Sequence, residues 1–493
     1  MCTVMPCTGF GTYQHHLFWL CGSGWLADNM WIQVLAVCLP ALQPEFSLSD
    51  SLAAGTLLSL TSAFSVATTT SMLGMLFGSI IWGLVSDKYG RRLPFLLTLL
   101  IAAIFGTSSA FAMSVPMFCL LLVGMGLGVG GSLPTDGSLF LEFVPMRQSM
   151  LVLMSLFWPA GQVLASLLGW MFITTESICT HDCVPSLDFN GWRGVMFSVG
   201  LITAFMAFLR LALFKLIESP KYLLKSGQRM SAFKALHTLA QYNDNQDTLA
   251  GLAIDDIPEI YDPGTLSGSE DTSSFWDRMA PLFAPELRVT TILVWMIWAS
   301  CSMAYSMYYA FLPKFLISVP NYFSAQADYV IISFAGVPGS VAAMYAVDTR
   351  LGRKGTMVVS TAATLISLLA FVVVSSAAAP RSEDPKASSL SLFVPLLLLI
   401  CNISASFFSN IMWGVLYSFT PEAFPTNVRA TAYGIASGMS KMAGIFAPLV
   451  TGALIELGGG GFTLPMWCSV LLFMLEGVLM FMLPFDTSGA SAL

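Results

Sequence analysis

Residues 83–92 read Gly83-Leu84-Val85-Ser86-Asp87-Lys88-Tyr89-Gly90-Arg91-Arg92 and follow directly after a long apolar run. A glycine in such a run lets two helices approach closely. Asp87 stands among three cations where two helices end, so it can pair with them or with the N-terminus of a helix. Such a cluster can form in one global state and break in another. We call residues 83–92 the gate segment because of this capacity; the alternative is a topology signal that holds a positive loop on one side.

The composition of the chain is that of a membrane protein. Of the 493 residues, 56% are hydrophobic and only 10% are charged, whereas soluble proteins carry about 25% charged residues. A single soluble core stops growing near about 250–300 residues, so lipid is the better solvent for this chain. The net charge of −7 argues against nucleic-acid binding, which needs a basic surface.

The sequence does not suggest catalysis. No combination of a nucleophile with a base stands out, and no cluster of metal ligands does, so we expect neither an enzyme nor a cofactor. Residues 1–16 contain no Lys or Arg, and the first apolar run is full length. This pattern argues against a cleaved signal peptide, and we expect the first helix to remain in the protein.

Twelve apolar runs are long enough for membrane helices, which need about 20 mainly apolar residues. Several contain Gly or Pro, which membrane helices tolerate. We therefore predict twelve transmembrane helices. The runs are 17–39, 54–86, 93–113, 116–141, 150–174, 194–217, 289–312, 328–347, 356–377, 391–419, 430–455 and 463–484.

The distribution of Lys and Arg predicts the orientation. Most of these residues flank the runs on one side, which the positive-inside rule assigns to the cytoplasm. Both termini then lie in the cytoplasm. The polar residues 218–288 form a central cytoplasmic loop between an N-terminal bundle, 1–217, and a C-terminal bundle, 289–493. Within this loop, residues 226–243 have the periodicity of a short surface helix, and residues 255–274 have the composition of a flexible linker.

Three short patterns occur in both bundles in the same order. The gate segment corresponds to Asp348-Thr349-Arg350-Leu351-Gly352-Arg353-Lys354, one residue longer in its first part. Glu142-Phe143-Val144-Pro145 corresponds to Glu422-Ala423-Phe424-Pro425, and Glu218-Ser219-Pro220 corresponds to Pro484-Phe485-Asp486-Thr487. Repeats of this kind build transporters whose site lies between the two halves. The predicted fold class is an all-α integral membrane protein with twelve transmembrane helices in two pseudo-symmetric six-helix bundles.

These patterns resemble the signature of the major facilitator superfamily, and residues 87–92 are its most specific motif. From Gly9 to Asp486 the chain is similar to the synaptic-vesicle-glycoprotein-related transporters and their fungal relatives, which border the organic-ion and sugar transporters. Other residues that carry this resemblance are Gly24-Trp25-Leu26-Ala27-Asp28-Asn29, Gly128-Val129-Gly130-Gly131, Gly191-Trp192-Arg193, and Thr420-Pro421-Glu422 with Arg429. The resemblance implies the major facilitator fold and gating by Gly83, Asp87, Lys88, Gly90, Arg91, Arg92, Glu142, Asp348, Gly352, Arg353, Glu422 and Arg429.

In this family, helices 1, 4, 7 and 10 line the central cavity, and each of these four runs carries a stripe of polar, aromatic or small residues. Steps of three and four residues place each stripe on one helical face. Polar stripes in apolar helices need water or protein around them; the alternative is that they hold neighbouring helices together. An aromatic cavity suits a small organic molecule with a flat or apolar body. The candidate substrate-binding residues on the stripes are Trp25, Asn29, Gln33, Ser132, Asp136, Trp298, Ser302, Tyr305, Tyr309, Asn402, Asn410, Trp413 and Tyr417.

Two charges stand in the middle of apolar runs, Asp28 in the first and Lys441 in the eleventh. A charge at mid-bilayer costs about 2.5–3.5 kcal/mol on insertion scales, so each needs a partner or water. Asp28 is our candidate proton-coupling residue, because burial favours its neutral form. Lys441 is our candidate anchor for a substrate anion. The alternative is a structural pair of Asp28 with Lys441 across the halves, or separate pairing with neighbours.

Two further charges lie inside apolar runs, and two cysteines lie in a polar loop. Arg210 and Glu476 lie in peripheral helices 6 and 12, and we interpret them as snorkelling or packing charges. Cys179 and Cys183 stand in a polar outer loop, where an oxidising compartment favours a disulfide. Free thiols are one alternative, and a metal site is another, because His and Asp stand between the two cysteines; we predict the disulfide.

These observations predict a secondary transporter that moves a small organic molecule by alternating access, as residues 1–217 rock against residues 289–493. We expect proton-coupled symport. Two alternatives stay open: a passive facilitator in which Asp28 is structural, and a transporter-like receptor or regulatory protein that moves nothing. We expect the partners to be the solute, a proton and the lipid bilayer, and the monomer to be the functional unit. The membrane is the plasma membrane or an internal, vacuolar or vesicular, membrane.

Overall fold

The computed structural model describes residues 11–45, 63–144, 149–173, 191–213, 216–245, 279–309, 312, 325–378, 393–426, 428–457 and 463–487. In these ranges the secondary structure is entirely helical. The N-terminal half contains α1 (Thr12–Glu45), α2 (Ala63–Tyr89), α3 (Arg92–Ser109), α4 (Val115–Gly130), α5 (Ser132–Phe143), α6 (Ser149–Met154), α7 (Phe157–Phe172), α8 (Trp192–Phe208) and a π-helical end (Leu209–Leu213). The C-terminal half contains α12 (Arg288–Tyr309), α14 (Ala325–Val347), α15 (Gly352–Ala378), α16 (Phe393–Glu422), α17 (Arg429–Leu457) and α18 (Thr463–Phe481).

Ten of the described segments are long and apolar enough to cross a membrane. Three of them are composite, because α4 with α5, α6 with α7, and α8 with its π-helical end each form one span. The helices α1 and α17, with 34 and 29 residues, are also long enough to cross a membrane. They complete the twelve helices of the predicted fold. Cys179 and Cys183 lie outside the described residues, so their disulfide stays a prediction.

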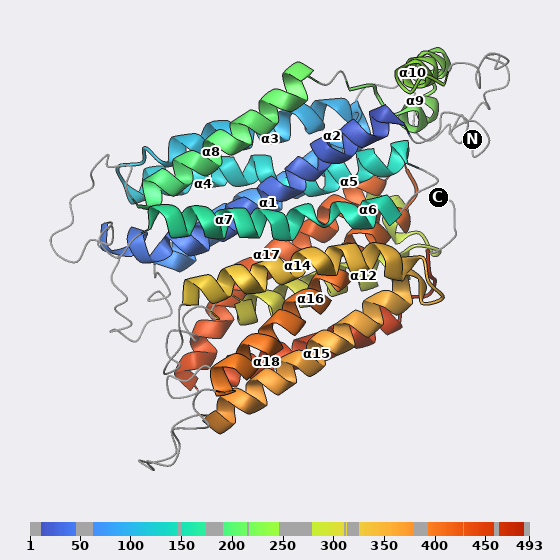
Figure 1. Cartoon of the computed structure of the whole chain (residues 1–493). Coiled ribbons are helices and arrows are strands. Elements are labelled where there is room, and N and C mark those ends of the chain that lie inside the picture. Colours follow the sequence, from blue (N-terminus) through green and yellow to red (C-terminus); the bar gives the residue numbers. More distant parts are fainter. Residues whose placement is uncertain are drawn as a thin grey trace, which may run out of the picture.

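The two halves lie side by side and meet along pairs of long helices (Figure 1). Helix α2 packs along α17, and α7 packs along α14. Between the halves in sequence, α9 (Pro220–Lys225) and α10 (Arg229–Tyr242) lie at one end of the bundle. The helix expected over residues 226–243 is thus confirmed, and its residues Leu236 and Leu239 are buried. We call this end, where α2 gives way to α3, the gate end, and the other the far end.

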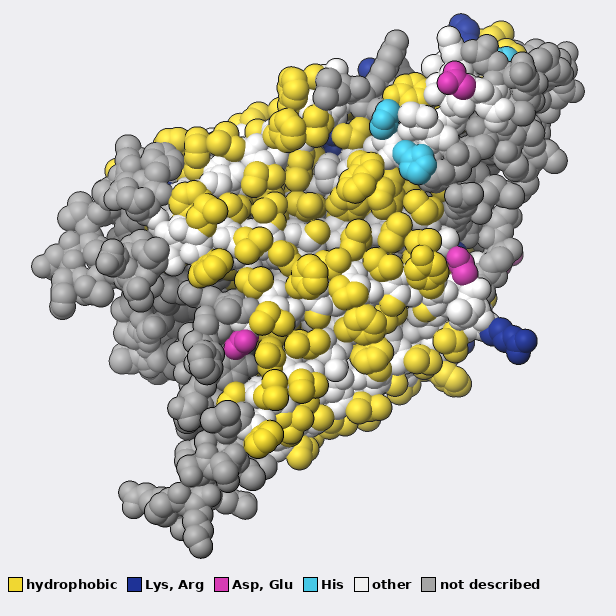
Figure 2. Space-filling model, in the orientation of Figure 1, with side chains coloured by type: hydrophobic (Ala, Val, Ile, Leu, Met, Phe, Trp, Pro, Cys, Tyr) yellow, Lys and Arg dark blue, Asp and Glu magenta, His cyan; other side chains and the backbone are white. Residues whose placement is uncertain are grey.

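The outer surface of the helices is hydrophobic. In Figure 2, apolar side chains cover the exposed face of the bundle, and most of the charged side chains in view lie toward its ends. Large apolar side chains such as Trp170 and Phe334 are more than half exposed, at 68% and 61%. Exposed apolar area of this extent would be unfavourable in water, but it is the expected surface of a protein whose solvent is lipid.

Candidate functional site

At the gate end, Asp87 connects the two halves. One carboxylate oxygen accepts a hydrogen bond from the guanidinium of Arg91. The other accepts from the backbone N–H of Thr431, at 2.6 Å, and from its hydroxyl, at 2.7 Å. Thr431 lies in the first turn of α17, where unpaired N–H groups and the helix dipole attract a negative charge. This arrangement is the helix N-terminus pairing that the sequence offered as one possibility for Asp87.

Two glycines make this contact possible. Gly83 lies against α17, where an added Cβ atom would stand 2.6 Å from the carbonyl oxygen of Ala430, so any larger residue would force α2 and α17 apart. Gly90 has φ +97°, a backbone conformation that only glycine adopts at low cost. Gly352, its counterpart in the second half, has φ +64°. The repeated glycines therefore serve the repeated turn between the second and third helices of each half.

Arg91 lies fully buried behind Asp87. Its guanidinium donates to Glu142 at 2.9 Å, to Ser86 at 3.1 Å, and to the carbonyl of Thr426 in the other half at 3.1 Å. Burial alone would lower the pKa of Arg91, but the nearby carboxylates of Glu142 and Asp87 outweigh burial and raise the pKa above its usual range. Arg91 is therefore a fixed cation around which the gate residues assemble.

The gate geometry is repeated, but only in part. Glu218 accepts from the backbone N–H groups of Arg91 and Arg92 at the start of α3. Asp486 caps the start of α15 in the same way, accepting from the N–H groups of Arg353 and Lys354. Each capping residue belongs to the third repeated pattern in the sequence, so its negative charge offsets the dipole of a helix that follows a gate motif.

The second gate motif differs from the first in the contacts of its acidic residue, Asp348. Arg353 binds Glu422 at 3.0 Å, as Arg91 binds Glu142. Asp348, however, is exposed at the gate end, whereas its counterpart Asp87 reaches across to α17. The extra residue in the second motif accounts for this difference, because it moves Asp348 out of the register that places an acid at the helix end.

In the middle of the bundle, Asp28 of α1 and Lys441 of α17 form an ion pair across the halves. The ammonium nitrogen lies 3.3 Å from Oδ1 and 3.5 Å from Oδ2 of the carboxylate. Asp28 is fully buried and Lys441 nearly so. The ammonium also lies 5.6 Å from the centre of the Trp158 ring, a distance at which a ring face stabilises a cation. The pairing that the sequence left as an alternative is thus present in this conformation.

A cluster of aromatic rings, the central aromatic cluster, surrounds this pair. Tyr417 lies at its centre, with ring centroids 5.2 Å from Trp25, 5.5 Å from Trp298 and 5.4 Å from Trp413. Tyr305 contacts Trp413 and stacks on Tyr309. All six were predicted from their stripes. The structure adds Trp158 of α7, 5.5 Å from Tyr417, and Tyr433 of α17, 5.8 Å from Trp298.

Sequence reasoning missed Trp158 and Tyr433 because neither lies on a helix that the family pattern marks as cavity-lining. Trp158 could have been noticed, since it begins a helix beside the polar Gln162, but no spacing linked it to α17. Within the cluster, the indole N–H of Trp25 and the hydroxyl of Tyr433 are buried without a hydrogen-bond partner in the described part of the chain. Both rings flank Gly137. These two donors are free to bind a polar group of a ligand.

Three of the predicted polar residues lie around the pair. Asn29 donates to the carbonyl of Trp158 at 2.8 Å, and Gln33 donates to Asn29 at 3.3 Å. Ser302 donates to the carbonyl of Ser440, the neighbour of Lys441, at 2.8 Å. These residues fix the positions of α1, α7, α12 and α17 around the centre.

Other predicted residues lie away from the central aromatic cluster. Asp136 is paired with Arg210 at 2.6 Å, with both side chains fully buried. Asn402 accepts from Tyr308 at 2.8 Å, and Asn410 donates to Ser406 on its own helix. The hydroxyl of Ser132 is buried and has no partner in the residues described. The Asp136–Arg210 and Asn402–Tyr308 contacts join different helices and are of the kind that hold helices together in a membrane.

Of the two roles expected for Arg210 and Glu476, snorkelling is wrong, and packing inside the bundle is what the structure shows. Both side chains are 0% exposed. Arg210 donates to Asp136 and to the carbonyls of Leu20 and Phe95, so it packs α8 against α1, α3 and α5. The sixth and twelfth spans, which are α8 with its π-helical end and α18, are peripheral in the family pattern. Residues on them can still face the interior of a half, and sequence position alone does not show which way they point.

Toward the far end, Tyr329 of α14 makes a third polar contact between the halves, after Asp87–Thr431 and Asp28–Lys441. Its hydroxyl donates to Gln33 of α1 at 2.8 Å and accepts from Gln162 of α7 at 3.3 Å. Sequence reasoning identified Gln33 but missed both partners, because Tyr329 and Gln162 each look like an isolated polar residue. The halves are therefore in contact at three depths, at the gate, at the ion pair and at this far-end latch.

We expect Tyr329→Phe to loosen the far end. Two hydrogen bonds of about 0.5–1.5 kcal/mol each are lost, so a separated far end should gain roughly five- to hundredfold in population. Spin labels at Leu167 of α7 and Ile331 of α14, both exposed, would report the distance. Tyr345→Phe, on the exposed gate-end part of α14, is the matched control. Identical distance distributions in Tyr329→Phe and the control would contradict the latch.

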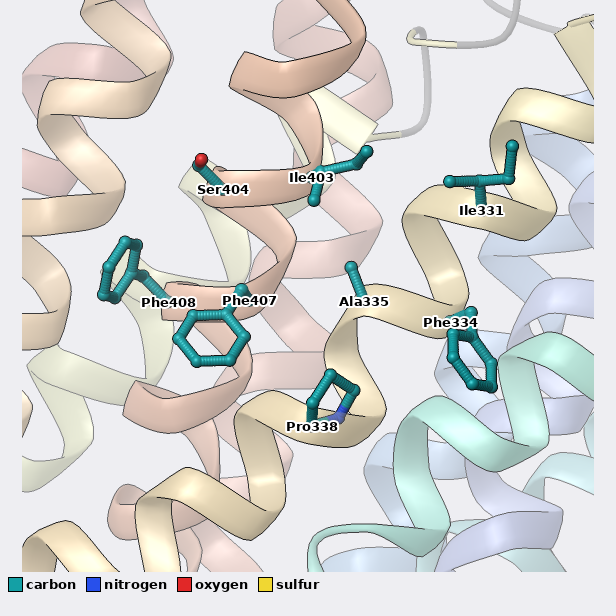
Figure 3. Close-up of a pocket in the computed structure, with 8 residues that line it drawn as sticks. All are labelled: Ile331, Phe334, Ala335, Pro338, Ile403, Ser404, Phe407 and Phe408. Atoms are coloured by element: carbon teal, nitrogen blue, oxygen red, sulfur yellow. The ribbon is translucent and has the colours of Figure 1, made fainter.

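The structure also contains an apolar pocket of about 380 Å³ between α14 and α16. Figure 3 shows its lining, which includes Pro338 inside α14. Ile331 and Phe334 are exposed, so the pocket opens onto the lipid-facing surface. None of the predicted site residues lines it, and Ser404 is its only polar side chain. We therefore place the candidate site at the central aromatic cluster and the Asp28–Lys441 pair.

Known proteins resemble the chain along most of its length. An uncharacterized MFS-type transporter of Schizosaccharomyces pombe is 32% identical and aligns with 98% of this chain and 87% of its own. A putative niacin/nicotinamide transporter of Bacillus subtilis is 28% identical over 90% of this chain and 88% of its own. The synaptic vesicle 2-related protein of Bos taurus is 28% identical over 91% and 74%.

A solved structure has the same fold. The proton:xylose symporter XylE bound to 6-bromo-6-deoxy-D-glucose superposes with a TM-score of 0.74 over 98% of both chains, at 17% identity. The family model described as "Sugar (and other) transporter" matches residues 34–489. With its twelve-helix architecture, its repeated gate motif and these matches, the chain belongs to the sugar (and other) transporter family of the major facilitator superfamily.

Proposed function

We propose that this protein is a proton-coupled symporter of a small organic anion that carries a flat, apolar body. The observation that carries the proposal is the Asp28–Lys441 pair, which is buried, spans the two halves and lies within the central aromatic cluster. In a structural pair between halves that never separate, buried apolar residues would serve as well. A pair at the moving interface can instead respond to the ligands that the halves exchange.

The coupling follows from charge balance. A proton that binds Asp28 removes the charge that holds Lys441, and the freed ammonium can then bind the anionic group of the substrate. The proton and the anion together add no net charge to a site of low dielectric, so loading both costs less than loading either one. After the proton and the substrate are released, Asp28 and Lys441 would pair again. The empty protein would then return to its starting conformation and complete the cycle.

The cluster supplies recognition of the rest of the substrate. Flat rings bind well between aromatic side chains in offset or edge contacts. The unpaired donors of Trp25 and Tyr433 offer hydrogen bonds to a polar atom of the ligand. The relative that is named a niacin/nicotinamide transporter supports a small ring-bearing solute.

Alternating access would use the contacts at the two ends. The Asp87–Thr431 contact closes the gate end, which the Lys and Arg distribution assigns to the cytoplasm, and the Tyr329 latch closes the far end. Breaking one set while the other persists would expose the centre to one side at a time. Residues 1–217 would rock against residues 289–493 in this cycle.

An uptake screen in proteoliposomes tests the proposal. The probes are benzoate, its neutral analogue benzamide, and xylose, each with and without an inward proton gradient. Because neutral benzoic acid crosses bilayers by itself, the baseline is uptake by protein-free liposomes under the same gradient. We expect accumulation of benzoate above this baseline only with the gradient, and loss of the excess when an ionophore dissipates it. Uptake that stops at equilibrium would identify a passive facilitator. No uptake of any member of a widened panel of small solutes would favour a receptor or regulatory role.

The topology can be checked independently. Cysteines introduced in residues 218–288 should react with an impermeant reagent only after the membrane is opened, whereas cysteines in residues 174–193 should react in intact cells. This result is expected because Lys and Arg favour the cytoplasmic side. Labelling of both segments from the same side would contradict the proposed orientation.

A further inference from the structure

Glu476 of α18 is a carboxylic acid with no countercharge among the residues that the structure describes. Its side chain is 0% exposed, and neither carboxylate oxygen has a hydrogen-bond partner in the part of the chain that the structure describes. It lies within the membrane-spanning segment Thr463–Phe481. The group that lies beside it is the thiol of Cys301, on α12.

The other buried carboxylates that the structure describes in the membrane spans each have a cationic partner. This contrast marks Glu476 as a different kind of group, because an ionised carboxylate in an apolar interior is very unfavourable without a partner and takes up a proton instead. The partners are Lys441 for Asp28, Arg210 for Asp136, Arg91 for Glu142 and Arg353 for Glu422.

The cations on the elements packed against α18 are engaged elsewhere or lie at the gate end. Lys441 binds Asp28, and Arg429 donates to the carbonyl of Pro421. Lys354 donates to the carbonyl of Leu483, and Arg353 binds Glu422. Arg288 is exposed at the start of α12. On α15, the hydroxyl of Thr361 faces Met480.

Glu476 is connected to the candidate site through neighbouring residues of α12 and α17. Its neighbour Cys301 precedes Ser302, which donates to the carbonyl of Ser440, and Ser440 precedes Lys441. The same helix, α12, thus contacts Glu476 through Cys301 and supplies Trp298 and Tyr305 to the central aromatic cluster. Helix α12 thus links Glu476 to the interface between the halves, where the Asp28–Lys441 pair lies.

We propose that Glu476 is a second proton-binding site, in the C-terminal half: it holds a proton while the gate is closed and exchanges it with solvent when the gate opens. The reaction is a reversible proton transfer between the carboxyl group and water, with no other co-reactant. The exchange rests on the alternating access proposed above, but it does not depend on which solute is carried or on whether Asp28 couples.

Infrared spectroscopy of the full-length protein in lipid nanodiscs tests the first half of the proposal. At neutral pH, the carbonyl band of a protonated carboxylic acid should be present in the wild type and reduced in Glu476→Gln, while Asp28→Asn should leave it unchanged. Identical bands in the wild type and Glu476→Gln would overturn the proposal. The glutamine is neutral and nearly isosteric, so Glu476→Gln should keep its unfolding temperature.

The stability control distinguishes a neutral acid from a hidden ion pair. Asp136→Asn removes the partner of the buried Arg210 and should lower the unfolding temperature clearly, because it leaves a buried charge unpaired. A loss of stability in Glu476→Gln as large as that in Asp136→Asn, or a failure to fold, would mean that Glu476 is ionised and paired, and the proposal would be rejected.

Titration of the acid band tests exchange with the cycle, without any substrate. Asp87→Asn weakens the closed gate, so the band of Glu476 should disappear at a pH lower by about one unit or more than in the wild type. Asp348→Asn, on the exposed counterpart, should leave the titration unchanged. Equal titration in the wild type and Asp87→Asn would show a fixed structural acid and overturn the second half. A failed solute screen would leave all of these outcomes unaffected.

Discussion

Asp28→Asn is expected to abolish accumulation of substrate against its gradient while part of the exchange activity survives. The asparagine is neutral, as the protonated aspartic acid is, so the variant resembles the loaded state at all pH values. Without a proton to bind and release, a proton gradient cannot drive uptake. The measurement compares gradient-driven uptake with counterflow exchange of labelled benzoate in the same proteoliposomes. Accumulation should fall to the level of protein-free liposomes under the same gradient.

Variants of Lys441 separate this coupling role from a structural one. Lys441→Ala should weaken binding of benzoate and spare that of benzamide, because only the anion needs the ammonium. If the pair were structural, each single change would leave a buried unpaired charge and lower the yield of folded protein, and Asp28→Asn with Lys441→Met would restore it. A double variant that folds well and still accumulates benzoate against a gradient would refute the coupling role.

Asp87→Asn should slow transport severely, with membrane insertion and substrate affinity largely preserved. The change weakens two hydrogen bonds from Thr431 to a charged acceptor, each of which contributes about 1.5–3 kcal/mol. A loss on the order of 3 kcal/mol would shift the balance between the closed and open gate by about a hundredfold. Initial rates of uptake and equilibrium binding of the same probe would separate turnover from affinity.

The chain offers a matched control for this effect. Asp348 occupies the corresponding motif in the second half but is exposed and out of register, so Asp348→Asn should leave turnover within about twofold of the wild type, as is usual for surface changes. Equal slowing by both variants would show that the charge of the loops matters rather than the contact with α17. Unchanged turnover in Asp87→Asn would show that the motif is only a topology signal here.

Much of the candidate site could be predicted from the spacing of residues, because aromatic and polar residues at steps of three and four lie on one face of a helix. Trp298, Trp413 and Tyr417 lie on helical faces whose period is visible in the sequence, and the structure joins them in one cluster. Asp136 shares the same kind of stripe, yet it faces Arg210. The stripe alone cannot distinguish these cases, because in a membrane protein a polar face can turn toward a cavity or toward a neighbouring helix.

The sequence by itself determined the twelve apolar helices, the six-helix repeat and the gate motif, because these depend on local composition and on short residue patterns. Only the tertiary structure decided which distant side chains meet: Asp87 with Thr431, Asp28 with Lys441, and Tyr329 with Gln33. It also left Glu476 without a cation among the described residues. The physical reason lies in the solvent. Lipid accepts apolar side chains as readily as the protein interior does, so hydrophobicity does not reveal how each helix is rotated, and close packing of the helices settles it.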